Sequence, residues 1–125
     1  MIRWLDHVNI RTANLTGLVR FYEEALGLRA GERPPLGFPG AWLYAGSRPV
    51  IHLVGVEQAP RPEGALRLEH FAFSADDLSE FLARLEQLGV PCKQTRQAGT
   101  GTVIVNLQDP DGNRLHVDFA ANEAG

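Results

Sequence analysis

The amino-acid sequence contains an internal repeat, and this repeat restricts the fold more than any other feature. Asp6-His7-Val8-Asn9-Ile10 corresponds to Glu69-His70-Phe71-Ala72-Phe73, which lies 63 residues further along the chain. Both segments place an acidic residue before a histidine, and both alternate as a half-buried strand does. Each is followed by apolar residues at helical spacing and then by three short strand-like segments. We therefore expect two βαβββ modules built on one repeated unit.

The ends of the two helices carry recognisable signals. Asn14 is a candidate N-cap of the first helix, and Asp77 with Glu80 resembles a capping box at the second. Gly27 and Gly89 suit the left-handed backbone that often ends a helix. The strand-like segments after the helices cover residues 28–32, 41–45 and 50–54 in the first half, and 92–97, 102–107 and 114–119 in the second.

The predicted fold class is α+β, with two βαβββ modules that form a curled eight-stranded mixed sheet around a cleft and carry their helices outside. We expect a single domain, residues 1–125, because this length is typical of one domain. Module one covers residues 1–55, a linker rich in proline and glycine covers 56–65, and module two covers 66–121. Asp109-Pro110-Asp111-Gly112-Asn113 predicts a tight turn before the last strand.

Composition excludes several classes of partner. The chain has 12 basic and 15 acidic residues, a net charge of −3, and no basic patch that would follow a phosphate backbone. It lacks an apolar run of the ~18 residues that cross a bilayer. We therefore expect no nucleic acid and no membrane partner, and a cytoplasmic location, since the N-terminus has no signal-peptide pattern. The single cysteine, Cys92, excludes an internal disulfide.

The four histidines of the chain take paired positions in the repeat. Each half places one histidine in its first predicted strand and one in its last, 45 residues apart in the first half and 46 in the second. Alternation sets these side chains on the face opposite the large apolar residues. Neutral imidazole is the commonest protein metal ligand, so the pattern indicates one divalent ion. A duplication that copied the histidines passively would give the same spacing. The candidate ligands are His7, His52, His70 and His116.

Other polar and aromatic residues share these faces. Asp118 follows His116 by two residues, so it is a candidate general base or a partner that orients the imidazole; a rim carboxylate facing water is the alternative. We take Asp118 and His116 as the candidate catalytic residues. Asp6 and Glu69, by alternation, are expected on the opposite face in a structural role.

Candidate substrate-binding residues come from the first module. Asn9 and Arg11 share the face of the first histidine, and Trp42 and Tyr44 share one face of a strand. Residues 32–40 form a long loop with three prolines and an exposed Phe38, and long loops are often binding loops. Ordinary packing would equally account for the aromatic residues, and an ordinary connection for the loop.

The chain resembles the vicinal oxygen chelate superfamily, which includes glyoxalase I, extradiol dioxygenases and bleomycin-binding proteins. The resemblance rests on the paired modules, on Leu5-Asp6-His7-Val8, on Phe21-Tyr22 followed by Leu26-Gly27-Leu28, and on the turn that begins at Asp109. It implies that the four histidines hold one divalent ion (Fe²⁺, Zn²⁺, Mn²⁺ or Ni²⁺). It also implies that a small substrate chelates this ion through two oxygens and that the chain forms a homodimer.

The sequence departs from this family at two of the ligand positions. The last-strand ligand is usually glutamate, where this chain has His116, and four-ligand isomerases often have glutamate or glutamine where it has His52. A glyoxalase-like lyase or isomerase is our first expectation, with an extradiol-type dioxygenase as an alternative. A metal-free antibiotic-binding protein or a purely structural metal site would also be consistent with these residues.

Overall fold

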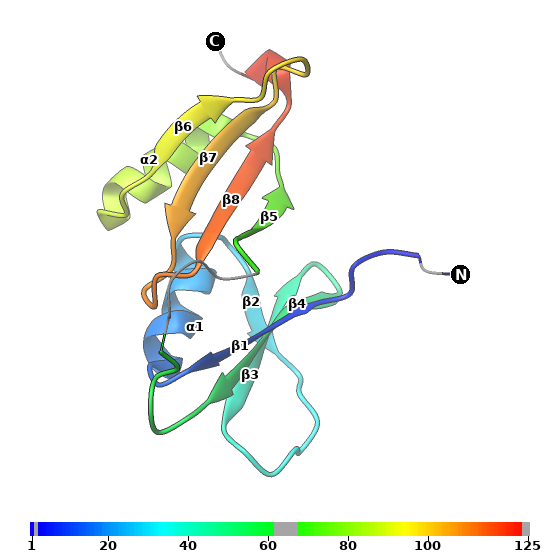
Figure 1. The fold of residues 1–125 in the computed structure, drawn as a ribbon, viewed down its shortest axis with the longest axis vertical. Coiled ribbons are helices and arrows are strands. Elements are labelled where there is room, and N and C mark those ends of the chain that lie inside the picture. The colour runs from blue at the N-terminus through cyan, green and yellow to red at the C-terminus, as the bar shows by residue number, and fades with distance from the viewer. Residues whose placement is uncertain (2, 62–67, 124–125) are drawn as a thin grey trace. The chain divides into compact units, whose positions relative to one another are not determined.

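A computed structural model describes residues 1, 3–61 and 68–123, in two compact units, Met1–Pro62 and Glu63–Gly125. Residues 62–65 of the expected linker lie outside the described residues. The first unit contains β1 (Val8–Thr12), α1 (Leu15–Glu24), β2 (Arg29–Gly31), β3 (Gly40–Ala45) and β4 (Arg48–Gly55). The second contains β5 (Phe71–Ser74), α2 (Leu78–Leu88), β6 (Lys93–Arg96), β7 (Val103–Gln108), β8 (Arg114–Phe119) and a short 3₁₀ helix, Ala121–Glu123 (Figure 1).

The two units have the same topology. The first sheet has the strand order β1-β4-β3-β2 and the second has the order β5-β8-β7-β6. The first strand of each unit pairs in parallel with the last one, and all other pairs are antiparallel. The expected α+β class and the two βαβββ modules are therefore confirmed, and each module carries its own four-stranded mixed sheet.

Helix α1 begins and ends as its sequence predicts. The side chain of Asn14 accepts a hydrogen bond from the backbone N–H of Gly17 at 3.2 Å, which satisfies a donor that the helix leaves free. Gly27, just beyond the helix, has a φ of 74°, a conformation that favours glycine. The helix packs on β2, β3 and β4 through its apolar stripe, in which the buried residues are Leu18, Phe21 and Tyr22.

Helix α2 has a more elaborate N-terminus. The Asp77 side chain accepts a hydrogen bond from the N–H of Glu80, as the capping signal predicts, although Asp77 itself has a φ of 65°. Glu123 accepts a second bond from the N–H of Leu78 at 2.8 Å. These two carboxylates, one local and one from the C-terminal segment, fix where the helix begins. Phe81 then packs against Phe119 of β8, with ring centroids 5.6 Å apart.

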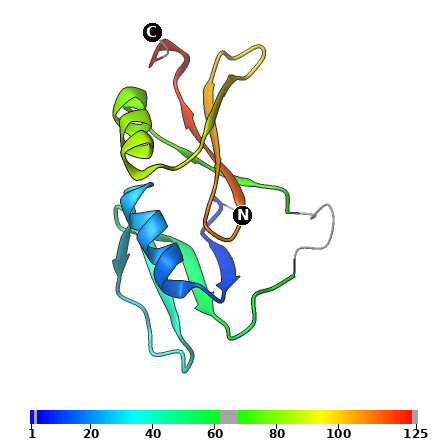
Figure 2. The ribbon, with the colours of Figure 1, turned by 90° about the vertical axis from the view of Figure 1, so that its left-hand side faces the viewer.

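One face of each sheet is apolar and buried, and this leaves the other face for polar residues. Figure 2 shows α1 and α2 each beside the sheet of its own unit. The apolar side chains alternate along the strands, as expected for a sheet with one covered face. In the first unit these buried residues are Ile10, Leu43, Ile51 and Leu53, and in the second they are Val103, Val105, Leu115, Val117 and Phe119.

The predicted turn between β7 and β8 is present and is held by one side chain. Asp109 is 4% exposed, and its Oδ1 accepts hydrogen bonds from the backbone N–H groups of Asp111 and Asn113, both at 2.9 Å. Its Oδ2 accepts a third from Nδ2 of Asn113 at 2.8 Å. Gly112 supplies the positive φ, 85°, that the turn requires.

In the part of the chain that the structure describes, neither helix is long and apolar enough to pass through a membrane.

Candidate functional site

Two of the predicted metal ligands lie together in the first unit. His52 is in the middle of β4, where the strand register places it between Asn9 of β1 and Trp42 of β3. The ring of His7, which immediately precedes β1, stacks on His52 with centroids 3.7 Å apart and planes 9° apart. Trp42 stacks on His52 as well, at 4.0 Å and 12°. The three rings form one column, which we call the aromatic column.

The protonation state of His52 follows from its surroundings. Its Nε2 lies 3.1 Å from the carbonyl oxygen of Pro49, and a carbonyl only accepts, so Nε2 carries the hydrogen. Burial lowers the pKa of His52 below its ordinary value, and the neighbouring His7 lowers that pKa further. His52 is therefore a neutral imidazole at neutral pH, with its lone pair on Nδ1.

The other two predicted ligands lie together in the second unit. His116 occupies the middle of β8, opposite Ala72 of β5 and Asn106 of β7. The ring of His70, just before β5, lies 4.7 Å from that of His116 between centroids, with planes 39° apart. Nδ1 of His116 lies 2.5 Å from Oδ1 of Asp118. Since an ionised carboxylate only accepts, Nδ1 donates and Nε2 keeps its lone pair.

The two pairs occupy equivalent places in the repeat. His52 and His116 are both central residues of a fourth strand, and His7 and His70 both immediately precede a first strand. The expectation that all four histidines lie within strands is wrong for His7 and His70, because the ladders begin at Val8 and Phe71.

An acidic residue also lies just before the first strand of each unit, and each of the two contacts the histidine that follows it. Oδ2 of Asp6 lies 2.8 Å from Nδ1 of His7, and Glu69 bonds Nδ1 of His70. The prediction that Asp6 and Glu69 point away from the histidines is therefore wrong, since strict alternation holds only within a strand. The hydrogen bond from the neighbouring histidine lowers the pKa of each of these carboxyl groups. Arg114 lies 3.6 Å from Glu69 and adds a positive charge beside it.

The chemistry of these donors fits a divalent metal ion. His7, His70 and His116 each have Nδ1 bonded to a carboxylate, the arrangement that commonly orients metal-bound histidines. Each of the three leaves Nε2 as the nitrogen that would face an ion.

The geometry of the stacked pair does not fit two bonds to one ion. An ion bonded in the plane of one ring would lie well out of the plane of the other, because the planes of His7 and His52 are nearly parallel. Within residues 1, 3–61 and 68–123, no group of three or more His, Cys, Asp or Glu side chains is positioned to hold an ion.

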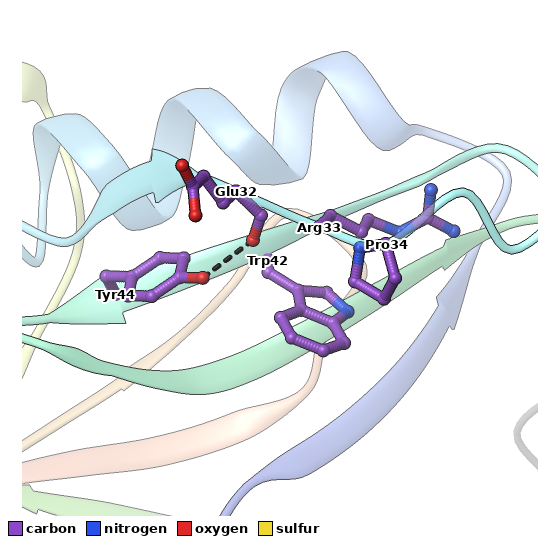
Figure 3. Close-up of a pocket in the computed structure, with 5 residues that line it drawn as sticks. All are labelled: Glu32, Arg33, Pro34, Trp42 and Tyr44. Carbon is purple, nitrogen blue, oxygen red and sulfur yellow. Dashed lines mark hydrogen bonds between the residues drawn. The ribbon is translucent and has the colours of Figure 1, made fainter.

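A pocket of about 450 Å³ lies beside the aromatic column in the first unit. Tyr44 lines it and donates a hydrogen bond from its hydroxyl to the carbonyl oxygen of Glu32 at 2.6 Å (Figure 3). Gly31 makes room for this ring, since a Cβ at that position would lie 2.8 Å from Tyr44 Cε1. The residues that line the pocket are Glu32, Arg33, Pro34, Trp42 and Tyr44.

The structure brings only part of the predicted substrate-binding set to this pocket. Trp42 and Tyr44 line it, whereas Phe38 is 44% exposed on the adjoining loop, with its ring 5.0 Å from the guanidinium of Arg33. Asn9 is exposed on β1, where it pairs with His52 of β4, and Arg11 is exposed two residues further along β1. Sequence reasoning missed Glu32, Arg33 and Pro34 as pocket residues. Their signal was the length and proline content of the loop that follows β2.

The topology of the two units indicates the class of protein. Two βαβββ modules, each with its first strand parallel to its last, are the architecture of the vicinal oxygen chelate fold. A family model described as the Glyoxalase/Bleomycin resistance protein/Dioxygenase superfamily matches residues 4–117. The chain belongs to this superfamily, and the resemblance found in its sequence is confirmed.

Solved structures agree with this membership. The glyoxalase family protein from Enterococcus faecalis is 29% identical, with a TM-score of 0.73 over 93% of this chain and 97% of that chain. Lactoylglutathione lyase from Agrobacterium tumefaciens is 23% identical, with a TM-score of 0.68 over 95% of both chains. The fosfomycin resistance protein FosX from Listeria monocytogenes is 15% identical, with a TM-score of 0.73 over 96% of this chain and 95% of that chain. The last two likenesses concern the fold alone. No curated protein matches the chain.

Proposed function

We propose that the chain is a metal-dependent enzyme, a glyoxalase-like lyase or isomerase that acts on a small oxygenated substrate. The proposed ligands of one divalent ion (Fe²⁺, Zn²⁺, Mn²⁺ or Ni²⁺) are His7, His52, His70 and His116, and binding by all four requires one ring of the stacked His7–His52 pair to turn out of the stack. The observation that carries the proposal is the repeated pairing: each unit holds two histidine rings together, at equivalent places of an identical topology. Membership of a superfamily with glyoxalases supports it further.

The carboxylates beside the histidines support the same assignment. A bound divalent ion would supply Lewis acidity to the oxygens of the substrate. Asp118 accepts the Nδ1 hydrogen of His116 and so fixes the ring tautomer that leaves Nε2 as a donor. Asp6 and Glu69 do the same for His7 and His70. Asp118 is therefore a positioning residue in this proposal, and it becomes a general base only if substrate reaches its second oxygen.

The substrate side of the proposed site lies in the first unit. Trp42 and Tyr44 line a pocket, and the ring of Trp42 also stacks on His52. Phe38 stands on the loop at its border. Asn9 and Arg11, on the polar side of β1, complete the proposed substrate-binding set. We also propose a homodimer in the cytoplasm, which light scattering and cell fractionation test.

A metal-free binding protein is the second candidate, and one observation favours it. His7 and His52 are stacked face to face, so in this arrangement they do not direct both lone pairs toward one point. Bleomycin resistance proteins are part of the same superfamily description. In this reading the aromatic column is a wall of a ligand pocket.

Metal content separates the two candidates. Protein purified without chelators is subjected to elemental analysis, and its thermal stability is measured with each of the four ions. The metal-enzyme proposal expects one ion per chain, a higher melting temperature with at least one ion, and loss of binding in His70→Ala and His116→Ala. Gln108→Ala, an exposed residue of β7, is the matched control and keeps the metal. Substoichiometric metal with an unchanged melting temperature for every ion would instead support the binding protein.

A further inference from the structure

The residues that line the pocket of the first unit indicate the chemical class of its ligand, which the proposed reaction class leaves open. We propose that it binds a planar, conjugated oxyanion, such as an aromatic carboxylate, with Trp42 as the stacking surface and Arg33 as the cation. The identification of this ligand as the substrate rests on the proposed function. Binding itself depends only on residues of the pocket and requires no metal ion.

The walls of the pocket favour a flat ligand. The indole of Trp42 is held in place because His52 covers one of its faces at a centroid distance of 4.0 Å. Pro34 and the Tyr44 ring line the same pocket, and their surfaces are rigid and largely apolar (Figure 3). A conjugated ring gains more from such a surface than a puckered one, since aromatic rings pack by stacking on one another.

The hydrogen-bonding groups of the two aromatic residues in the pocket favour a ligand that accepts a hydrogen bond. Among the described residues, none accepts a hydrogen bond from the indole N–H of Trp42. The one hydroxyl of the pocket, on Tyr44, already donates to the carbonyl oxygen of Glu32. A ligand oxygen would therefore meet a donor that the protein leaves unused.

The charge on the Arg33 side of the pocket favours an anion, although the lining also contains the Glu32 carboxylate. One Nη of Arg33 donates to the carbonyl oxygen of Phe38 at 2.9 Å, while its Nε is buried without a hydrogen-bond partner. Within the described ranges no carboxylate forms an ion pair with Arg33, and Figure 3 shows the Glu32 carboxylate directed away from it. Residues 1–62 contain seven arginines and five acidic residues, a net charge of +2 in a chain whose total is −3. An anion would supply the counter-charge that Arg33 lacks.

The indole N–H signal of Trp42 reports directly on this pocket. In ¹⁵N-labelled Trp4→Phe protein, Trp42 is the only tryptophan, so one indole cross-peak is followed by NMR. The protein is treated with EDTA and titrated with benzoate, benzyl alcohol and cyclohexanecarboxylate. We expect benzoate to move the indole peak and to bind about tenfold more tightly than either analogue, as a charge-assisted contact and a stacking contact both contribute.

Substitution of Arg33 then tests the charge. Arg33→Gln is expected to weaken benzoate binding about tenfold while it leaves benzyl alcohol binding within about twofold. Arg33→Lys retains the cation and is expected to retain most of the preference for benzoate. Arg29→Gln, at an exposed arginine of β2 that does not line the pocket, is the matched control and binds benzoate as the parent does. The spectra of all variants show whether the fold is kept.

Three results would overturn the proposal. Equal affinity for benzoate and cyclohexanecarboxylate would show that Trp42 does not act as a stacking surface. Equal affinity for benzoate and benzyl alcohol would show that Arg33 does not bind the anion. If none of the three compounds moved the indole peak, the pocket would not be a binding site for these ligands. Because every titration is done in EDTA, these failures are distinct from a failure of the histidines to bind metal.

Discussion

Nδ1 of His116 lies 2.5 Å from Oδ1 of Asp118, two residues further along the same strand. Both side chains leave the same face of β8, the face opposite Leu115 and Val117. Their side chains are 16% and 32% exposed, so the bond is partly shielded from water. This short contact sets which ring nitrogen of His116 is free, and so it decides what the histidine offers to a ligand.

Removal of the Asp118 carboxylate is expected to weaken metal binding without removing a ligand. Asp118→Ala frees the His116 ring to rotate and makes its Nε2 a poorer donor, so affinity falls by roughly 10–100-fold. Isothermal titration with the ion found in the native protein measures the change. Asp76→Ala, at an exposed carboxylate before α2, serves as the control. Unchanged affinity in Asp118→Ala would contradict the positioning role.

The stability of the protein is expected to fall in mildly acidic solution because of His52. Its pKa lies below the ordinary 6.5, chiefly because of burial, so the folded protein takes up fewer protons than the unfolded chain. The free energy of unfolding therefore decreases as the pH drops below 6.5 and continues to fall until the pH passes the folded pKa. Asp6 and Glu69 act in the same direction at lower pH, below 3.8 and 4.5.

His52→Gln tests this pH dependence. Urea unfolding is compared at about pH 7 and about pH 5 for the parent and the variant. The parent should lose more stability over this interval, since the variant has no group to protonate at position 52. The same loss in both proteins would mean that His52 is not the source.

The turn at Asp109 is expected to depend on its buried carboxylate. Asp109→Ala removes the acceptor of three part-buried hydrogen bonds, each of which contributes about 0.5–1.5 kcal/mol. Chemical denaturation measures the loss. Asp111→Ala, at an exposed position of the same turn, should have little effect. If both variants were equally stable, the side chain would not hold the turn.

The core of the second unit is expected to depend on Phe119. This ring is 1% exposed and packs on Phe81, so Phe119→Ala leaves a cavity and costs about 3–5 kcal/mol. Leu5→Ala, at a side chain that is 79% exposed, should change stability by no more than about 0.5 kcal/mol. Denaturant titration of the two variants gives both values, and a loss below about 1 kcal/mol for Phe119→Ala would show that the cavity closes.

The local elements of this protein follow from its sequence by itself. The repeat, the alternating strands, the caps at Asn14 and Asp77, and the turn at Asp109 all depend on residues within a few positions of one another. Periodicity also assigned the faces correctly within strands, so the polar side of β8 was predictable from Leu115 and Val117. Such features need no long-range contact, because backbone geometry and nearby hydrogen bonds determine them.

The arrangement of the candidate sites was decided by tertiary structure. His7 stacks on His52 only because β1 pairs in parallel with β4, a strand from the far end of the same module. Asp6 and Glu69 reach their histidines because they lie just outside the ladders, where alternation no longer applies. The position of Arg33 depends on how the loop after β2 folds back toward Phe38. Sequence periodicity fixes which face a side chain takes within a strand, but the pairing of distant strands and the paths of loops decide which side chains meet.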